Sequence, residues 1–341
     1  MSSPSASPPP FGSVTAESMA VSRTARGEFG PPEVVPTAPL TLHPATHALH
    51  YGSSCFEGLK AHRGTDGVVR LFRAGTHAER FRASAAALCL PVPPAELVLD
   101  MVRATVEANA TQVPDPPGAL YVRPMLLGMD ANVGAAAVPS AEALLCVVAS
   151  PVGSYFAGGE RALTVAIETE LPRSTPQFGA VKTGANYAMA LGTLQRARAE
   201  GADQVLFAPG GDVQETGASN VVVVAGDRVI ARPPDGSILA GVTRDSVVQL
   251  ARHLGLAVEE RAFTVHELMG EAPLGEVALS GTAAVLTGVG TLVHDGVRVT
   301  VGDGGVGAVT RQLRDALYAV QRGESEDRWG WTEEIGSVAP S

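Results

Sequence analysis

Lys182 is one of only two lysines in a chain of 341 residues, in which lysine and arginine together number 25. An arginine guanidinium stays protonated, whereas a lysine amine can act as a nucleophile and form a Schiff base with a carbonyl compound. A genome that favours arginine codons would also remove lysines. The surroundings of Lys60 and Lys182 must therefore decide whether either residue does chemistry.

The sequence around Lys182 reads Gly-Ala-Val-Lys-Thr-Gly-Ala-Asn-Tyr over residues 179–187. Small residues on both sides leave room for a bulky group against the backbone, and we expect a helix to begin at about Asn186. A helix N-terminus favours anions, so a lysine beside it is electrostatically misplaced if it is merely structural. Two interpretations remain at this point, a Schiff-base amine and an exposed loop lysine.

Glu215 begins the segment Glu-Thr-Gly-Ala-Ser-Asn, which leads into the apolar run 221–225. A carboxylate that enters a buried strand needs a partner, because an unpaired buried charge is costly. The protonated ring nitrogen of a cofactor would be a suitable partner. A surface carboxylate at the end of a strand is the alternative.

Two short segments combine glycine with hydroxyl residues, namely Gly-Val-Thr-Arg at 241–244 and Ser-Gly-Thr-Ala at 280–283. The first opens an expected helix and the second ends an expected strand. Backbone N–H groups in such turns can hold a phosphate, although ordinary N-caps use the same residues. Neither a Walker pattern nor G-x-G-x-x-G after a strand occurs, which argues against nucleotide binding.

Apolar periodicity predicts alternating strands and helices in two unequal parts, which favours an α+β or α/β enzyme. Expected strands lie within 40–73 and at 119–127, 142–151, 163–168, 204–208, 215–225, 276–280 and 288–294. Expected helices lie at 75–88, 95–109, 186–200, 243–254, 265–268 and 309–322. We expect a disordered tail over 1–25, a small domain over 26–155, an interdomain loop over 156–170 and a larger domain over 171–341.

The net charge of −10 argues against nucleic acid or an anionic membrane as the main partner. No apolar run approaches the length of a membrane span, and the Ser- and Pro-rich start lacks a signal core. Three cysteines without a C-x-x-C spacing indicate a reduced, cytoplasmic setting and no metal site.

In order and spacing, nine segments resemble the branched-chain amino acid aminotransferases, which are class IV, fold type IV, pyridoxal-phosphate enzymes. These segments are 49–52, 56–60, 70–80, 120–124, 182–187, 215–220, 241–245, 280–284 and 326–331. The resemblance therefore covers about residues 40–331. It implies a two-domain fold with a smaller N-terminal domain and a larger, mixed-sheet C-terminal domain that binds pyridoxal 5′-phosphate.

The resemblance also implies a role for individual residues. Lys182 matches the Schiff-base lysine, Glu215 the acid beside the pyridine nitrogen, Tyr187 the phenol beside the cofactor's O3′, and Arg80 the phosphate-binding arginine. Lys60 follows a shared segment, and we interpret it as structural. The remaining phosphate positions are Val242, Thr243, Gly281 and Thr282, and the substrate positions are Tyr51, Phe56, Tyr121, Arg123, Tyr155 and Ala283.

The implied activity is that of a branched-chain-amino-acid transaminase, acting on leucine, isoleucine or valine with 2-oxoglutarate, in a homodimer. A D-amino acid aminotransferase, an aminodeoxychorismate lyase, an aminotransferase for a nonstandard hydrophobic amino acid and a catalytically silent protein of this fold are the alternatives. The intact set Lys182, Glu215 and Arg80 argues against the silent protein. Departures from the family pattern at Val222 and within 286–290 leave the preferred amino donor open.

Overall fold

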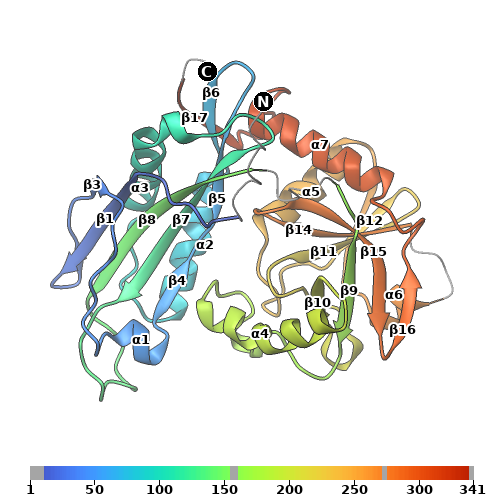
Figure 1. The fold of residues 1–341 in the computed structure, drawn as a ribbon, viewed down its shortest axis with the longest axis horizontal. Coiled ribbons are helices and arrows are strands. Elements are labelled where there is room, and N and C mark those ends of the chain that lie inside the picture. Colours follow the sequence, from blue (N-terminus) through green and yellow to red (C-terminus); the bar gives the residue numbers. More distant parts are fainter. Residues whose placement is uncertain (1–10, 154–159, 271–274, 338–341) are drawn as a thin grey trace, which may run out of the picture. The chain divides into compact units, whose positions relative to one another are not determined.

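The computed structural model describes residues 11–153, 160–270 and 275–337, and its contacts divide the chain into two compact units (Figure 1). Unit 1 comprises residues 1–159 together with 319–341, and unit 2 comprises residues 160–318. The expected domains differ from this structure in bounds and in relative size. Residues 18–25, expected in a disordered tail, form a strand, and the end of the chain belongs to the N-terminal unit. The N-terminal unit, expected to be the smaller of the two, is therefore the larger.

Unit 1 is built on a nine-stranded sheet in the order β17-β6-β5-β7-β8-β1-β2, with β3 paired to β1 and β4 paired to β7. Every strand pair in this sheet is antiparallel. Its strands are β1 (Ser18–Ala25), β2 (Glu28–Phe29), β3 (Glu33–Pro36), β4 (Ser54–Phe56), β5 (Leu59–Arg63), β6 (Val68–Phe72), β7 (Ala119–Gly128), β8 (Ala143–Val152) and β17 (Thr332–Ser337). Its helices are α1 (His47–Tyr51), α2 (Ala74–Ala87) and α3 (Ala95–Ala108), with a 3₁₀ turn at Ala110–Gln112.

The two faces of this sheet differ in chemistry, because side chains alternate along a strand. Leu120 and Val122 of β7 belong to the apolar core of the unit, together with Phe81 of α2 and Met101 of α3. Tyr121 points to the opposite face, where its register partner on β5 is Lys60. Tyr121 and Lys60 therefore lie on the face away from α2 and α3, which we call the polar face.

Unit 2 is built on an eight-stranded mixed sheet in the order β10-β9-β15-β14-β11-β12-β13, with β16 paired to β15. Its strands are β9 (Leu163–Glu168), β10 (Gln204–Phe207), β11 (Asn220–Ala225), β12 (Arg228–Ala231), β13 (Ala257–Glu260), β14 (Glu276–Gly281), β15 (Val285–His294) and β16 (Val297–Thr300). Its helices are α4 (Gly184–Ala199), α5 (Val242–His253), α6 (Val265–Met269) and most of α7 (Ala308–Arg322), and its 3₁₀ turns are Pro176–Phe178 and Pro209–Gly211. Strand β9 coincides with the strand expected at 163–168, and it lies inside the segment 156–170 that we expected to be an interdomain loop.

Strand β11 is shorter than the strand expected over 215–225, because residues 215–219 form a turn. The Thr216 hydroxyl accepts from the backbone N–H of Ser219 at 2.9 Å, and the Thr216 N–H donates to the Ser219 carbonyl at 2.9 Å. Hydroxyl residues compete with strand pairing in this way. Glu215 is therefore carried on a turn that enters the sheet at Asn220.

Across the described residues, we find no helix that is both long and apolar enough to span a membrane.

Candidate active site

Lys182 lies immediately before α4, two residues ahead of its first residue, and Tyr187 lies on the first turn of that helix. Lys182 Nζ and Tyr187 Oη are 3.1 Å apart, and both side chains are half-buried. The buried Asn186 fixes this segment, since its side-chain amide donates to the carbonyls of Phe178 and Val181, each at 2.8 Å. The amine is therefore held against a phenol by an anchored loop.

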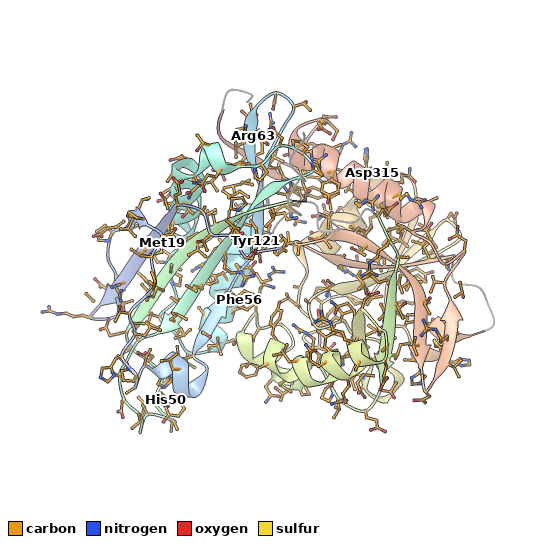
Figure 2. The ribbon with its side chains drawn as sticks, viewed as in Figure 1. Met19, His50, Phe56, Arg63, Tyr121 and Asp315 are labelled. Carbon is orange, nitrogen blue, oxygen red and sulfur yellow. The ribbon has the colours of Figure 1, made fainter. Side chains whose placement is uncertain are left out.

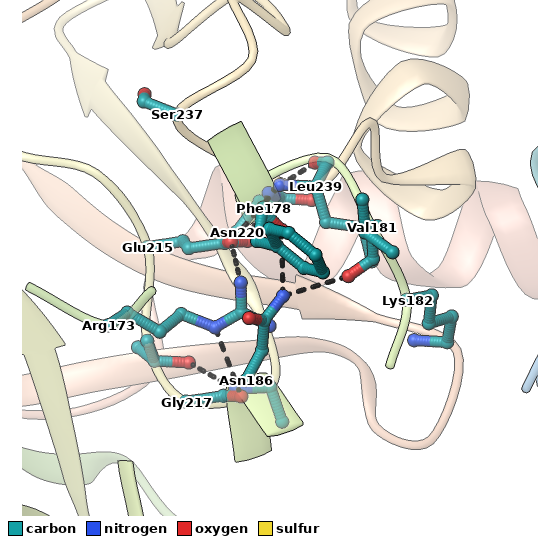
Figure 3. A network of polar contacts seen from close by, with 12 residues as sticks. Arg173, Phe178, Val181, Lys182, Asn186, Glu215, Gly217, Asn220, Ser237 and Leu239 are labelled. Carbon is teal, nitrogen blue, oxygen red and sulfur yellow. Dashed lines mark hydrogen bonds and ion pairs between the residues drawn. The ribbon is translucent and has the colours of Figure 1, made fainter. Parts of the chain in front are cut away.

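Glu215 is a buried carboxylate that accepts from Arg173, Leu239 and Asn220 (Figure 3). It is 2% exposed, and Arg173 Nη1 lies 2.5 Å from Oε1. The Leu239 N–H donates to Oε1 and the Asn220 amide donates to Oε2, both at 3.0 Å. Ion pairing and hydrogen bonding offset the cost of burying this charge.

Asn220 connects the acid to the N-terminus of α5. Its amide also donates to the Leu239 carbonyl at 3.0 Å, and a Cβ on Gly241 would lie 1.9 Å from its Oδ1. Only glycine fits there, so Gly241 lets α5 begin directly beside β11. The first N–H groups of a helix have no acceptor inside it, which makes the backbone at Val242 and Thr243 suited to an anion.

The second glycine-rich turn lies beside the same asparagine, because Ser280 is the register partner of Asn220 between β14 and β11. The Ser280 hydroxyl oxygen is buried without a hydrogen-bond partner. A Cβ on Gly281 would lie 3.1 Å from the Ser219 hydroxyl, so the turn at 281–283 packs closely on the Glu215 turn. Unit 2 thus brings together Glu215, both predicted phosphate turns and the position of Ala283.

Arg80 belongs to unit 1, where α2 carries it and its ion-pair partner is Glu57. Arg80 Nε and Nη2 donate to the two oxygens of Glu57 at 2.6 and 2.9 Å, and His77 Nδ1 lies 2.7 Å from the same carboxylate. Burial by itself would raise the pKa of Glu57, but Arg80 and His77 hold that pKa well below its ordinary value. A fork-shaped, charge-assisted pair of this kind fixes the orientation of the guanidinium.

Three of the predicted substrate residues, Phe56, Tyr121 and Arg123, contact one another in unit 1, and Figure 2 labels the first two. Arg123 donates to the Tyr121 hydroxyl at 2.8 Å, and its guanidinium lies 4.5 Å from the Phe56 ring centroid. A cavity of about 290 Å³ lies beside them. Its lining comprises Phe11, Gly12, Thr15, Tyr121, Arg123, Val148, Ala149 and Ser150.

The other predicted substrate residues lie elsewhere. Tyr51 ends α1, and its hydroxyl donates to the Val133 carbonyl. Tyr155 falls outside the described residues. Ala283 lies on the turn between β14 and β15 of unit 2.

Lys60 is buried on the polar face of β5, and burial, with a contribution from Arg322, lowers its pKa to about 8. A guanidinium beside a buried amine disfavours its charged form. Lys60 lies in unit 1. Lys182, Glu215 and both predicted phosphate turns lie in unit 2.

The family assignment comes from comparison with known proteins. Residues 54–292 match the family model for amino-transferase class IV. The chain belongs to this family.

Relatives of this class IV aminotransferase share most of its length. It is 40% identical over 315 residues to branched-chain-amino-acid aminotransferase 5, chloroplastic, of Arabidopsis thaliana, covering 91% of this chain and 74% of the relative. It is 37% identical over 316 residues to the branched-chain-amino-acid aminotransferase of Mycobacterium tuberculosis, covering 89% and 85%. These matches confirm the predicted membership of the branched-chain group.

A solved structure agrees with the sequence relatives. The branched-chain amino acid aminotransferase of Escherichia coli matches with a TM-score of 0.78 and 28% identity, covering 94% of this chain and 100% of that chain. The predicted fold class is confirmed.

The aminotransferase uses pyridoxal phosphate, and the donor set of unit 2 fits this cofactor. An amine beside a phenol suits an aldehyde carbon, a buried carboxylate suits a protonated ring nitrogen, and two glycine-rich turns with an unpartnered buried hydroxyl suit a phosphate. The role of each residue remains our prediction. Among the described residues, no group of three or more His, Cys, Asp or Glu side chains could hold a metal ion.

Sequence reasoning missed three residues of this aminotransferase. Arg173 and Asn220 hold Glu215, and Phe11 lines the unit 1 cavity with its ring 5.0 Å from that of Tyr121. Phe11 lies in the Ser- and Pro-rich start that composition marks as disordered. A buried acid should have prompted a search for a buried arginine, but no local pattern identifies which arginine it is.

Proposed function

We propose that this protein transfers the amino group between branched-chain L-amino acids and 2-oxoglutarate, giving branched-chain 2-oxo acids and L-glutamate. The observation that carries the proposal is the 37–40% identity, over about nine-tenths of the chain, to proteins named branched-chain-amino-acid aminotransferases. The amine, phenol and acid of unit 2 supply groups that this chemistry needs.

Bound pyridoxal phosphate supplies an aldehyde that carries the amino group and a ring that accepts the electrons of the Cα–H bond. Lys182 would hold the cofactor through its aldehyde group. The Lys182 amine, when free, would take the proton from the substrate Cα as a general base and return it as a general acid. The Tyr187 hydroxyl, 3.1 Å from Nζ, orients the amine for this work. Glu215 would accept a hydrogen bond from the ring nitrogen and would favour the protonated form of that nitrogen.

On the substrate side, the pocket must accept both an aliphatic side chain and the distal carboxylate of glutamate. Phe56, Tyr121 and Phe11 supply apolar surface, and the Arg123 guanidinium between two of these rings supplies the charge for a carboxylate. A further branched-chain amino acid aminotransferase of known structure, 27% identical to this chain, supports such dual use. It has been solved complexed with N-(5′-phosphopyridoxyl)-L-glutamate and with 4-methylvaleric acid.

The protein acts as a homodimer in the cytoplasm. Leu49, Val133 and Val138 expose more than half of their side-chain surface on α1 and the segment after β7, as expected for an interface. The reduced cysteines Cys55, Cys89 and Cys146 suit a reducing compartment.

Borohydride reduction of the purified holoenzyme tests the assignment, because the chain has only two lysines. Peptide mass spectrometry should find the phosphopyridoxyl group on Lys182, with the Lys60 peptide as an internal control. Lys182→Ala should abolish turnover. Labelling at Lys60, or turnover by Lys182→Ala, would contradict the assignment.

A substrate panel tests the reaction itself. With 2-oxoglutarate as acceptor, L-leucine, L-isoleucine and L-valine should be turned over, whereas D-alanine should not. Aminodeoxychorismate should yield no pyruvate. Faster turnover of D-alanine or aminodeoxychorismate than of L-leucine would replace the proposed activity with that of another class IV enzyme.

A further inference from the structure

Arg173 is a buried cation on a loop, between β9 and α4, where no helix or strand requires it. Its side chain is 3% exposed, and Nη1 lies 2.5 Å from Glu215 Oε1. Its Nε donates to the Gly217 carbonyl at 3.4 Å, and its guanidinium carbon lies 5.7 Å from the Tyr187 ring centroid. One cation therefore contacts the predicted acid, the turn that carries it and the phenol beside Lys182.

The ion pair with Arg173 affects whether the Glu215 carboxylate is protonated. A buried carboxylate without a cation would favour its neutral, protonated form, because burial disfavours charge. A guanidinium stabilises the anion and cannot itself give up its proton. Arg173 thus makes the Glu215 carboxylate a weaker base than the same buried carboxylate would be without the guanidinium.

We infer that Arg173 is a positioning residue that, through its contact with Glu215, keeps the proton on the cofactor's ring nitrogen rather than on the carboxylate. The inference rests on the proposed role of Glu215 as the partner of that nitrogen. A proton shared by two groups lies on the more basic one, and Arg173 lowers the basicity of the oxygen side. No bond between heavy atoms is made or broken, and the proton is bonded either to the ring nitrogen or to the carboxylate oxygen.

The arrangement around Glu215 supports a role beyond filling space. The Asn220 amide and the Leu239 N–H are neutral donors that hold the carboxylate in place, and both are fixed by the backbone around them. Arg173 adds the charge that these donors lack. Its guanidinium carbon also lies 5.7 Å from the Tyr187 ring centroid, but its direct ion pair is with Glu215.

The test is the ring-nitrogen chemical shift of ¹⁵N-labelled pyridoxal phosphate bound to the full-length protein, with steady-state kinetics in parallel. The wild type and Arg173→Lys, which keeps the charge, should show a protonated nitrogen. Arg173→Gln should shift the signal toward the unprotonated value and lower kcat by roughly 100-fold, with little change in KM. A protonated signal and wild-type kcat in Arg173→Gln would overturn the inference, as would an unprotonated signal in Arg173→Lys.

A matched control separates this role from simple stabilisation. Arg232 is another nearly buried arginine of unit 2, paired with Asp212 and Asp235 at 2.7 Å each. Arg232→Gln should destabilise the protein to a similar extent and leave the ring-nitrogen signal unchanged. An equal change of signal in Arg232→Gln would show that Arg173 acts only through stability and would refute the inference.

A double-mutant cycle with Glu215→Gln keeps the test decisive even if Arg173→Gln folds poorly, because the double variant buries no unpaired charge. If Arg173 acts through Glu215, Arg173→Gln should change neither the signal nor kcat further in the Glu215→Gln background. A further loss there would refute the inference. If Glu215→Gln itself leaves the ring nitrogen protonated, the proposed role of Glu215 fails, which is a separate outcome.

Discussion

Glu57 shows how a single buried residue can orient another that is predicted to bind the cofactor. Its carboxylate is 1% exposed and receives two nitrogens of Arg80 and one of His77. The guanidinium can therefore adopt few orientations. A predicted phosphate ligand held in this way loses little side-chain freedom on binding, which favours affinity.

Replacing Glu57 with Gln should lower the free energy of unfolding of the cofactor-free protein by about 3 kcal/mol at pH 7, because it removes the buried charge that pairs with the part-buried Arg80. The pKa of Glu57 lies below its ordinary value in the folded protein. Its stabilising contribution is therefore present above the ordinary value of 4.5 and is lost as the pH falls below it. Urea denaturation at pH 7 and at pH 3.5 should show the gap between wild type and variant shrinking on acidification.

Glu79→Gln is the matched control for that experiment, since Glu79 lies on α2 beside Arg80 but is exposed and paired with Arg82. We expect its unfolding free energy to stay within about 0.5 kcal/mol of wild type. A loss in Glu79→Gln as large as that in Glu57→Gln would assign the effect to α2 in general rather than to the Glu57–Arg80 pair.

At the scale of elements, strand β5 carries an unusual concentration of buried polar groups. All five of its residues are buried, among them Lys60 and His62. Neither ring nitrogen of His62 has a hydrogen-bond partner, and burial, followed by the charges of Lys60 and Arg322, lowers the pKa of His62 well below its ordinary value. The buried Lys60 and His62 side chains lower the free energy of unfolding, because burial disfavours their charged forms.

Lys60→Met should reveal that cost and its dependence on pH. The folded pKa of about 8 lies below the ordinary value of 10.5, so between these values the unfolded chain binds a proton that the folded chain lacks. The free energy of unfolding of the wild type should therefore rise with pH across this window. The cost of burying Lys60 is largest below pH 8. The advantage of Lys60→Met should be about 3 kcal/mol at pH 7 and should shrink toward pH 10.5.

Lys60→Arg separates charge from shape in that measurement, because arginine stays protonated throughout the window. Its stability relative to wild type should fall as the pH rises from 8 to 10.5, because only the wild type gains stability there. Chemical denaturation of the three proteins at several pH values decides the matter. Parallel curves for wild type and Lys60→Met would show that Lys60 does not titrate in this window.

Which elements could be predicted depended on how local their signals are. Helix α5 was expected at 243–254 and is found at Val242–His253, because its apolar stripe and opening glycine are contiguous in sequence. The turns around Lys182 and Glu215 were recognisable for the same reason. Strand β17 could not be predicted, since its partner β6 lies more than 250 residues earlier and no local pattern records that pairing.

Arg173 was missed for a related reason. It lies in a stretch without periodicity, and its partner Glu215 is 42 residues away. Composition misled the prediction for Phe11 and β1, because a Ser- and Pro-rich start was taken to extend to residue 25. Strand β1 pairs with β8, and these two strands lie more than a hundred residues apart in sequence, so no local pattern records the pairing.

At the scale of the whole molecule, the exposed apolar surface of unit 1 bears on assembly. Leu49 is 59% exposed, Val133 65% and Val138 62%. Two hydrogen bonds connect α1 to the segment after β7 and fix this surface. The His47 N–H donates to the Asp130 carbonyl at 2.8 Å, and the Tyr51 hydroxyl donates to the Val133 carbonyl. Apolar side chains fixed in this way on α1 and the segment after β7 are typical of an interface.

The double variant Leu49→Glu with Val133→Glu should therefore dissociate the proposed homodimer, because each glutamate would have to be buried unpaired at the interface. Size-exclusion chromatography with light scattering should give twice the chain mass for the wild type. We expect the dimer dissociation constant of the variant to rise by at least about 100-fold. Val297→Glu is the matched control, since Val297 is similarly exposed, at 58%, but lies on β16 of unit 2. A monomeric wild type would refute the dimer, and a dimeric double variant would move the interface away from α1.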